Sequence, residues 1–287
     1  MSAVATTGLS PFITGIVLAA AVAHASWNAI VHDISDKLVA FTLFCTGGGL
    51  VAIALVIVSP LPRGPSWPYL IASVVTHVGY YVLLMQAYRL GEFSQVYPLA
   101  RGTSPLVVTV LAAVFVHELP STLQLVGIVV VSAGLGSLVL VGRRPGRADV
   151  PALLAALGTG LTIATYTTLD GIGVRLSGSH WGYTGWLILL ESIAIPAIAF
   201  ARRGPALFGQ IRPSLAKGLF GGGLSLLAYG LVLWAQTQGT LASVAALRES
   251  SIIVGAIIGT LVFHERFGRP RVVATVIVVA GIVLLNV

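Results

Sequence analysis

The chain has few charged residues. Only 9% of its 287 residues are charged and 56% are hydrophobic, whereas an average soluble domain has about 25% charged residues. A water-soluble protein of this length could not cover its surface with so few charges. The composition therefore excludes a soluble protein and predicts that the chain lies in a lipid bilayer.

Cysteine is almost absent as well. The single cysteine, Cys45, lies inside an apolar run, so an intrachain disulfide and a Cys-x-x-Cys motif are both excluded. We interpret Cys45 as a packing residue.

The sequence also lacks catalytic signatures. It contains no Gly-x-Ser-x-Gly, His-Glu-x-x-His or phosphate-binding loop, which excludes ATP-driven transport within this chain. We therefore predict no enzyme activity, no catalytic residue, no cofactor and no metal ligand. Two His-Glu pairs, at 117–118 and 264–265, precede Pro or Gly within a few residues, and we interpret them as helix corners with capping and turn roles.

The net charge of +7 does not indicate nucleic-acid binding here. The Lys and Arg residues gather in the short breaks between apolar runs, where they set topology and contact anionic lipid headgroups.

Apolar runs dominate what is present. A spanning helix needs about 20 mostly apolar residues, and breaks at Pro, Gly and charge clusters predict ten such segments. They are 11–32, 37–58, 68–89, 94–116, 121–141, 150–174, 181–201, 213–236, 241–263 and 270–286. Glycines such as Gly47, Gly48 and Gly222 put small residues on helix faces and indicate close helix contacts.

Four residues of the first half recur in the second half, each 147 positions later. They are Arg101, His117, Glu118 and Gly134, which match Arg248, His264, Glu265 and Gly281. We predict that residues 1–145 and 146–287 are two copies of a five-helix unit. Because five is odd, the second copy enters the membrane from the opposite side. The predicted fold is therefore all-α, with ten transmembrane helices arranged as two inverted repeats around a central cavity.

The distribution of Lys and Arg predicts the orientation. Twelve of these residues follow the odd-numbered segments, whereas only Arg63 and Arg175 follow the even-numbered ones. By the positive-inside rule, the odd-numbered breaks lie in the cytoplasm and both termini lie outside.

Several polar side chains fall at membrane depth. They are costly there unless they face a cavity or the bundle interior, so each is a candidate for substrate binding. His24, Trp27 and Asn28 share one face of the first segment, and His77, Tyr80 and Tyr81 repeat that spacing in the third. The other candidates are Tyr97, Arg101, Tyr166, Glu191, Tyr229, Trp234, Arg248 and Glu249.

Structural alternatives exist for some candidates. In the structural alternative for Arg101 and Arg248, the two arginines hold the two halves together, and Glu249 is the ion-pair partner of one of them. His77 and His24 would each donate a hydrogen bond to a backbone carbonyl on a neighbouring helix. Glu191 has no residue in its own segment that neutralises it.

The chain resembles the EamA-type members of the drug/metabolite transporter superfamily. The resemblance rests on the two-copy plan, the corner glutamates with their following glycines, and the run His24-Ala-Ser-Trp27-Asn28. It implies a basket of ten helices, with a substrate cavity formed mainly by helices 1, 3, 4, 6, 8 and 9. Members export amino acids and other metabolites. This chain has no Glu in its first segment, unlike the four-helix multidrug relatives, and ten-helix relatives are commonly drawn with cytoplasmic termini.

We therefore expect a secondary transporter of the bacterial inner membrane that moves a small zwitterionic metabolite, such as an amino acid, by alternating access and in the direction of export. A choline-like carrier with an aromatic cage is the alternative within this class. A membrane enzyme or assembly subunit without transport activity is the alternative outside it. The expected partners are the small-molecule substrate and the lipid bilayer. We expect a monomer to be sufficient for transport, and the sequence is also compatible with a dimer.

The charge asymmetry yields a topology prediction. Single cysteines introduced at Arg144 and Arg203 in a Cys45→Ala background should be shielded from an impermeant thiol reagent in intact cells. A cysteine introduced at Ser2 should react. Labelling of both arginine positions from outside would reverse the predicted orientation.

Overall fold

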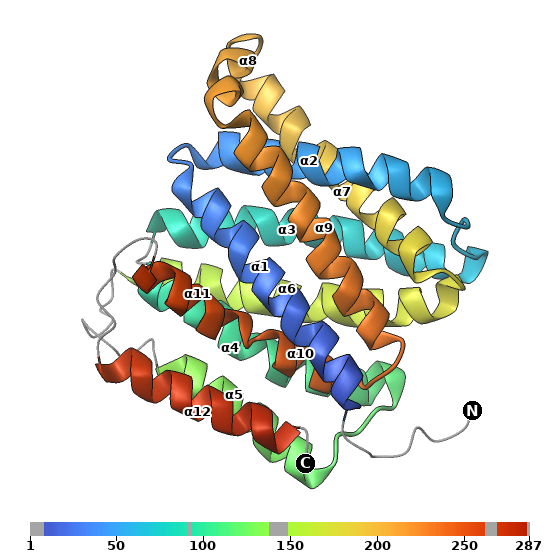
Figure 1. Cartoon of the computed structure of the whole chain (residues 1–287), viewed down its shortest axis with the longest axis vertical. Coiled ribbons are helices and arrows are strands. Elements are labelled where there is room, and N and C mark those ends of the chain that lie inside the picture. The colour runs from blue at the N-terminus through green and yellow to red at the C-terminus, as the bar shows by residue number, and fades with distance from the viewer. Residues whose placement is uncertain (1–8, 91–92, 138–148, 262–268, 286–287) are drawn as a thin grey trace.

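The structure is a computed structural model that describes residues 9–90, 93–137, 149–261 and 269–285. In these ranges the regular elements are all helices, so the all-α prediction is confirmed (Figure 1). In chain order they are α1 (Pro11–Asp33), α2 (Lys37–Val58), η1 (Gly64–Ser66), α3 (Trp67–Leu90), α4 (Phe93–Leu111), η2 (Ala112–Val116), α5 (Thr122–Ser137), α6 (Val150–Ser177), α7 (His180–Arg203), α8 (Ala206–Ile211), η5 (Arg212–Ser214), α9 (Leu215–Gln236), α10 (Leu241–Arg248), α11 (Ser251–Leu261) and α12 (Arg269–Leu285).

The helices fit a polytopic membrane protein. Within the described residues, 7 helical stretches are long and apolar enough to cross a bilayer, and α5 and α12 are shorter apolar helices. Together with α10 and α11, these elements account for all ten predicted segments. Many large apolar side chains lie on the outer surface, among them Ile57, Val58 and Phe220, as expected where lipid tails are the solvent.

Capping residues, proline and glycine mark where several helices begin and end. The Ser10 hydroxyl accepts a hydrogen bond from the Ile13 amide and caps α1, and Pro11 occupies the first turn, where its missing N–H has no cost. Gly178 ends α6 with a φ of 71°, a left-handed conformation that favours glycine.

The ninth segment is not continuous, and the prediction of one helix over 241–263 is wrong. The chain forms α10 and α11 with a break at Glu249 and Ser250. At the break, the amides of Glu249 and Ser250 donate to the carbonyls of Ala246 and Leu247, three residues back. These bonds to the third residue back replace the α-helical bonds to the fourth residue back. The break lies within a run of four polar residues, 248–251.

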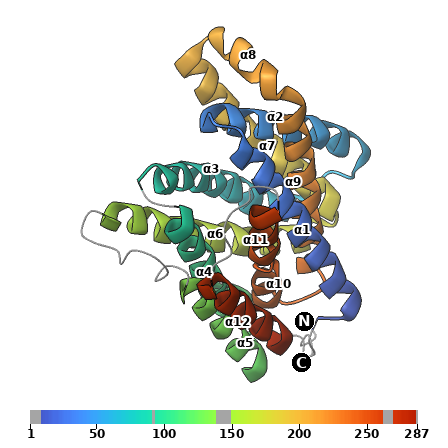
Figure 2. The same ribbon diagram turned by 60° about the vertical axis from the view of Figure 1, so that its left-hand side comes forward.

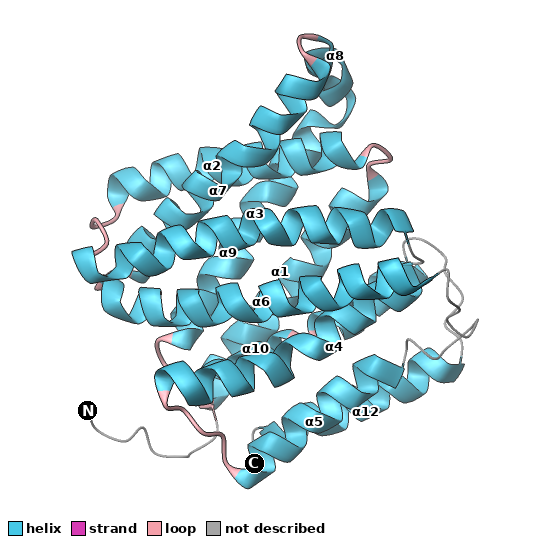
Figure 3. Cartoon of the chain, turned by 180° about the vertical axis from the view of Figure 1, so that it is seen from behind, coloured by secondary structure: helices cyan, strands magenta, loops and turns pink. Residues whose placement is uncertain are grey.

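The halves pack in matched pairs. The first membrane segment of each half is α1 or α6, the third is α3 or α9, and the fourth contains α4 or α11. Helices α3 and α4 of the first half pack on α6, and α9 and α11 of the second half pack on α1. Helix α2 pairs with α7, and α5 pairs with α12. Figure 2 shows α5 and α12 side by side at one edge of the bundle, and Figure 3 shows α3 beside α6. This pattern is what a two-fold relation between halves requires. The predicted boundary between residues 145 and 146 lies outside the described residues.

Charged residues tie the α1–α2 turn to the end of α7. Asp36 caps α2 by accepting hydrogen bonds from the amides of Leu38 and Val39. Arg203 donates to both carboxylate oxygens of Asp36, at 2.6 and 3.1 Å. The Arg203 guanidinium lowers the pKa of this carboxyl group. The turn therefore stays anchored to α7 on the side predicted to be cytoplasmic.

Glycines allow α2 and α9 to touch through their backbones. A β-carbon at Gly47 would collide with the backbone of Leu219, and one at Gly222 would collide with the carbonyl of Phe44 and the amide of Gly48. The close-contact interpretation of these glycines is thus confirmed. The two helices meet without intervening side chains.

This contact yields a stability prediction. Gly222→Ala should lower the thermal stability of the protein in detergent, because the added methyl group meets backbone atoms that cannot move aside, and overpacking costs about 1–3 kcal/mol. Gly223→Ala is the matched control, since its β-carbon would meet only Val51 at 3.5 Å, an ordinary contact. Equal melting temperatures for the two variants would contradict the assigned contact.

Candidate functional site

A buried group of aromatic and acidic side chains lies where four helices meet. We call it the acid–aromatic cluster. Its members are His77, Tyr80 and Tyr81 of α3, Tyr166 and Asp170 of α6, Tyr183 and Glu191 of α7, and Tyr229 of α9. The spacing of three and four residues on α3 places its members on one helix face, as predicted.

His77 lies at the centre of this cluster. Its ring stacks on Tyr166 with centroids 3.9 Å apart and an interplanar angle of 23°. Its Nδ1 lies 3.0 Å from the Ser73 carbonyl and 3.2 Å from the Ser73 hydroxyl, so it donates to the carbonyl in one tautomer and accepts from the hydroxyl in the other. The alternative that His77 binds a carbonyl on a neighbouring helix is therefore wrong, since Ser73 lies one turn earlier on the same helix.

Asp170 is fully buried and held by two tyrosines. The hydroxyl of Tyr183 donates to Oδ1 at 2.9 Å, and that of Tyr229 donates to Oδ2 at 2.5 Å. The sequence itself places Asp170 one helical turn after Tyr166 at membrane depth, in an apolar segment. The list of predicted site residues nevertheless includes Tyr229 and leaves out Asp170 and Tyr183.

Glu191 is buried but only partly hydrogen-bonded. The Tyr81 hydroxyl donates to Oε1 at 3.4 Å. Oε2 lies 3.7 Å from Nδ1 of His77 and accepts no hydrogen bond. The polar contacts of the two carboxylate oxygens thus come from α3, as expected for a residue that its own segment leaves unneutralised.

A small cavity adjoins Glu191 between α2, α7 and α9. Its volume is about 10 Å³, which is room for roughly one water molecule. Its lining comprises Phe44, Cys45, Gly48, Ile188, Glu191, Ser192, Gly222, Ser225 and Leu226. The cavity therefore lies at the crossing of α2 and α9, next to their glycine contact.

A second group, the arginine–glutamate cluster, lies at the break between α10 and α11. Nε of Arg101 is 3.0 Å from Oε2 of Glu249, and Nη2 of Arg101 donates to the Ser251 hydroxyl at 3.0 Å. Nη2 of Arg248 is 3.8 Å from Oε1 of Glu249. All three charged residues are buried. The expectation that Glu249 pairs with one of the arginines is confirmed.

Arg248 is the less satisfied of the two arginines. Its Nε and Nη2 are buried and donate no hydrogen bond. Tyr166 lies within electrostatic range of Arg248 and Arg101, and also of Asp170. The charges of both clusters therefore act on the Tyr166 hydroxyl.

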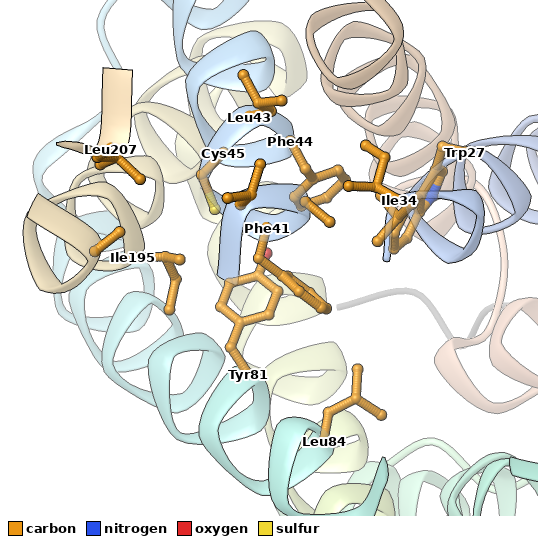
Figure 4. Packing of buried hydrophobic residues seen from close by; sticks show 14 residues of the cluster. Trp27, Ile34, Phe41, Leu43, Phe44, Cys45, Tyr81, Leu84, Ile195 and Leu207 are labelled. Atoms are coloured by element: carbon orange, nitrogen blue, oxygen red, sulfur yellow. The ribbon is translucent and has the colours of Figure 1, made fainter. Parts of the chain in front are cut away.

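The candidates on α1 contact each other and the aromatic side chains of α2. The Trp27 indole donates to Nδ1 of His24 at 3.3 Å, and the Asn28 amide donates to the His24 carbonyl of the same helix. Trp27 also packs on Phe44, with centroids 4.6 Å apart. Figure 4 shows Trp27 and Phe44 in the apolar cluster that also contains Tyr81.

Trp234 is not brought to either cluster. Trp234 packs edge-on against Phe12, with centroids 6.0 Å apart, among apolar side chains near the start of α1. Tyr97 lies on α4, and its side chain is outside the described residues.

The first His-Glu corner connects the two halves. His117 has a φ of 57°, so the turn interpretation is confirmed. Glu118 accepts a hydrogen bond from the Leu241 amide at the start of α10, and it pairs with Arg175 at 2.5 Å. Arg175 also donates to the carbonyls of Gln236 and Gly239. The cap thus serves a helix of the other half. The second corner, at 264–265, lies outside the described residues.

The buried ion pair yields a prediction. Arg101→Met should lower stability strongly, because removing one partner of a buried pair costs about 3–5 kcal/mol. Lys217→Met breaks an exposed pair with Asp33 and should cost about 0–1 kcal/mol. Chemical unfolding of the two variants in detergent would check this order, and similar midpoints would contradict it.

Comparisons with known proteins fit this geometry. The model of the EamA-like transporter family matches residues 6–140 and again residues 150–287. No curated protein matches the chain. Among 27 matching chains of solved structures, one described only as a crystal structure of a protein has a TM-score of 0.73 at 16% identity. That similarity covers 96% of this chain and 97% of the other, and it shows a shared fold.

The family model matches nearly the whole chain, in two consecutive units, and the structure supplies the membrane helices that such a protein needs. The chain therefore belongs to the EamA-like transporter family and is a multi-pass membrane transporter of the drug/metabolite type.

Proposed function

We propose that this protein is a secondary transporter that exports a small zwitterionic metabolite, such as an amino acid, across the inner membrane of a bacterium by alternating access. The supporting observation is a pair of incompletely satisfied, oppositely charged groups, one in each of the two clusters. Arg248 has two buried nitrogen atoms that donate no hydrogen bond, and Glu191 has a buried oxygen that accepts none. A zwitterion has a carboxylate that can accept hydrogen bonds from Arg248 and an ammonium group that can donate one to Glu191.

The arginine–glutamate cluster suits a carboxylate. Its two guanidinium groups share the single carboxylate of Glu249, which leaves one positive charge in excess. A guanidinium binds a carboxylate through paired, charge-assisted hydrogen bonds. Helix α11 begins at Ser251, beside this cluster, and the N-terminus of a half-helix favours an anionic substrate group in transporters with broken helices.

The acid–aromatic cluster suits an ammonium group. Glu191 provides a carboxylate oxygen that accepts no other hydrogen bond. The rings of Tyr166, Tyr80 and Tyr81 lie nearby, and aromatic faces attract cations.

Export, inner-membrane location and outward termini are carried over from the family resemblance and the Lys/Arg distribution.

A choline-like cation is the second candidate, because the cluster is rich in aromatic rings. The ring of His77 lies within 6.5 Å of four tyrosine rings, centroid to centroid. These rings contact one another instead of enclosing a space. A substrate without a carboxylate would also leave the excess positive charge beside Arg248 without a counter-ion, so a zwitterion is favoured.

A binding screen followed by flux measurement tests the proposal. Thermal shift in detergent would be measured with the twenty standard amino acids, choline and phosphorylated metabolites. Flux of the stabilising compounds would then be measured in proteoliposomes that contain only this chain. We expect amino acids to stabilise the protein and to cross the membrane.

Arg248→Gln should reduce amino-acid flux roughly tenfold or more, because a hydrogen bond to a charged group contributes about 1.5–3 kcal/mol. Arg212→Gln is the matched control, since Arg212 is exposed in η5, and it should transport like the wild type. Flux of choline without amino acids would favour the second candidate. An absence of flux for all compounds would favour a non-transporting membrane enzyme or assembly subunit.

A further inference from the structure

The carboxyl group of Glu191 has an incomplete set of partners. It lies near the middle of α7 and is 5% exposed. Tyr81 donates to Oε1, but Oε2 accepts no hydrogen bond. Nδ1 of His77 lies 3.0 Å from the carbonyl and 3.2 Å from the hydroxyl of Ser73 but 3.7 Å from Oε2, so its hydrogen-bond partner is Ser73 and not Glu191.

The groups that face Glu191 do not neutralise a negative charge. Helix α2 contributes the Cys45 thiol, α3 contributes His77 and Tyr81, and α6 contributes Asp170, a second acid. Helix α9 contributes only Ser225, Gly222 and Leu226 to the adjoining cavity. Among the described residues, His77 is the one basic side chain within 4 Å of Glu191.

A buried carboxylate with this environment is costly in its ionised form. Two events relieve that cost: Oε2 or His77 binds a proton, or a cation arrives beside the carboxylate. The ammonium group of the proposed substrate is such a cation. Protonation and substrate binding therefore compete for the same oxygen.

We propose that Glu191 and His77 form a proton-binding pair that releases a proton when the substrate ammonium group binds and takes one up when it leaves. The proposal rests on the proposed function for its coupling to substrate. The proton bound to the pair passes to water, and the ammonium group replaces it as the partner of Oε2. The pair loses one positive charge with the proton and the ammonium group restores it, so the net charge of the pair and its bound cation is conserved and each substrate moves against one proton.

The structure offers a route and a connection for this exchange. The cavity beside Glu191 has room for roughly one water molecule, and a water there would relay a proton from the carboxyl group toward the α2–α9 crossing. On the other side, His77 stacks on Tyr166, on which the charges of Arg248 and Arg101 act. A substrate that reaches from the arginine–glutamate cluster to the acid–aromatic cluster would bring its ammonium group to the proton-binding pair.

A first experiment needs no substrate. Infrared titration of the purified protein should show a protonated carboxyl band that fades as pH rises. The band should be lost in Glu191→Gln and kept in Asp33→Asn, whose carboxylate is exposed at the end of α1. Persistence of the full band in Glu191→Gln would overturn the proposal.

A second experiment measures coupling. Proteoliposomes would contain a pH-sensitive dye, with valinomycin and potassium on both sides to clamp the voltage, and a mixture of the twenty standard amino acids would be added outside. Wild type should make the interior more alkaline as amino acids enter. Glu191→Gln should lose this change, and Glu191→Asp should restore part of it.

The outcomes separate this inference from the proposed function. Amino-acid uptake by wild type without a change of internal pH would overturn proton coupling and leave the transporter proposal intact. An unchanged pH response in Glu191→Gln of normal thermal stability would also overturn it. A titrating Glu191 band in a protein that moves no amino acid would support the proton-binding pair and contradict the proposed substrate.

Discussion

One buried charge pair constrains much of this structure. Arg101 of the first half and Glu249 of the second meet inside the membrane bundle, where neither charge is tolerated without a partner. Their contact fixes α4 against the break between α10 and α11. Because Arg248 draws on the same glutamate, the two repeated arginines are bound to one anion. The two copies of the sequence repeat thus contribute their arginines to one cluster. This cluster has two guanidinium groups and one carboxylate, so one positive charge is in excess.

The helices were largely predictable, since the length of an apolar run and the breaks around it are local properties of the sequence. The break at Glu249 and Ser250 was not predictable in this way. Apolar residues continue on both sides of it, so the segment reads as one helix. The break accompanies the contact of Glu249 with Arg101, almost 150 residues away in the chain, and hydropathy alone does not register such contacts.

The site was predictable only where helical spacing was decisive. His77, Tyr80 and Tyr81 share a face, and the structure joins them to Tyr166. Spacing does not reveal which neighbouring helix receives a side chain, so Asp170 was not recognised as the acceptor of two tyrosine hydroxyls. For the same reason Trp234 was grouped with the site although it packs on Phe12. An aromatic ring near a helix end fits either environment equally well.

The contact of Glu118 with α10 bears on whether the halves are autonomous. The first amide of α10 is capped by a carboxylate from the other half, which also binds Arg175. A fragment beginning after residue 146 would keep Arg175 and the start of α10 but lose the acceptor they share, leaving a cation and an N–H group at the edge of the membrane without it. The halves are therefore duplicated in sequence but complementary in assembly. The first half completes a helix terminus that the second half cannot complete by itself.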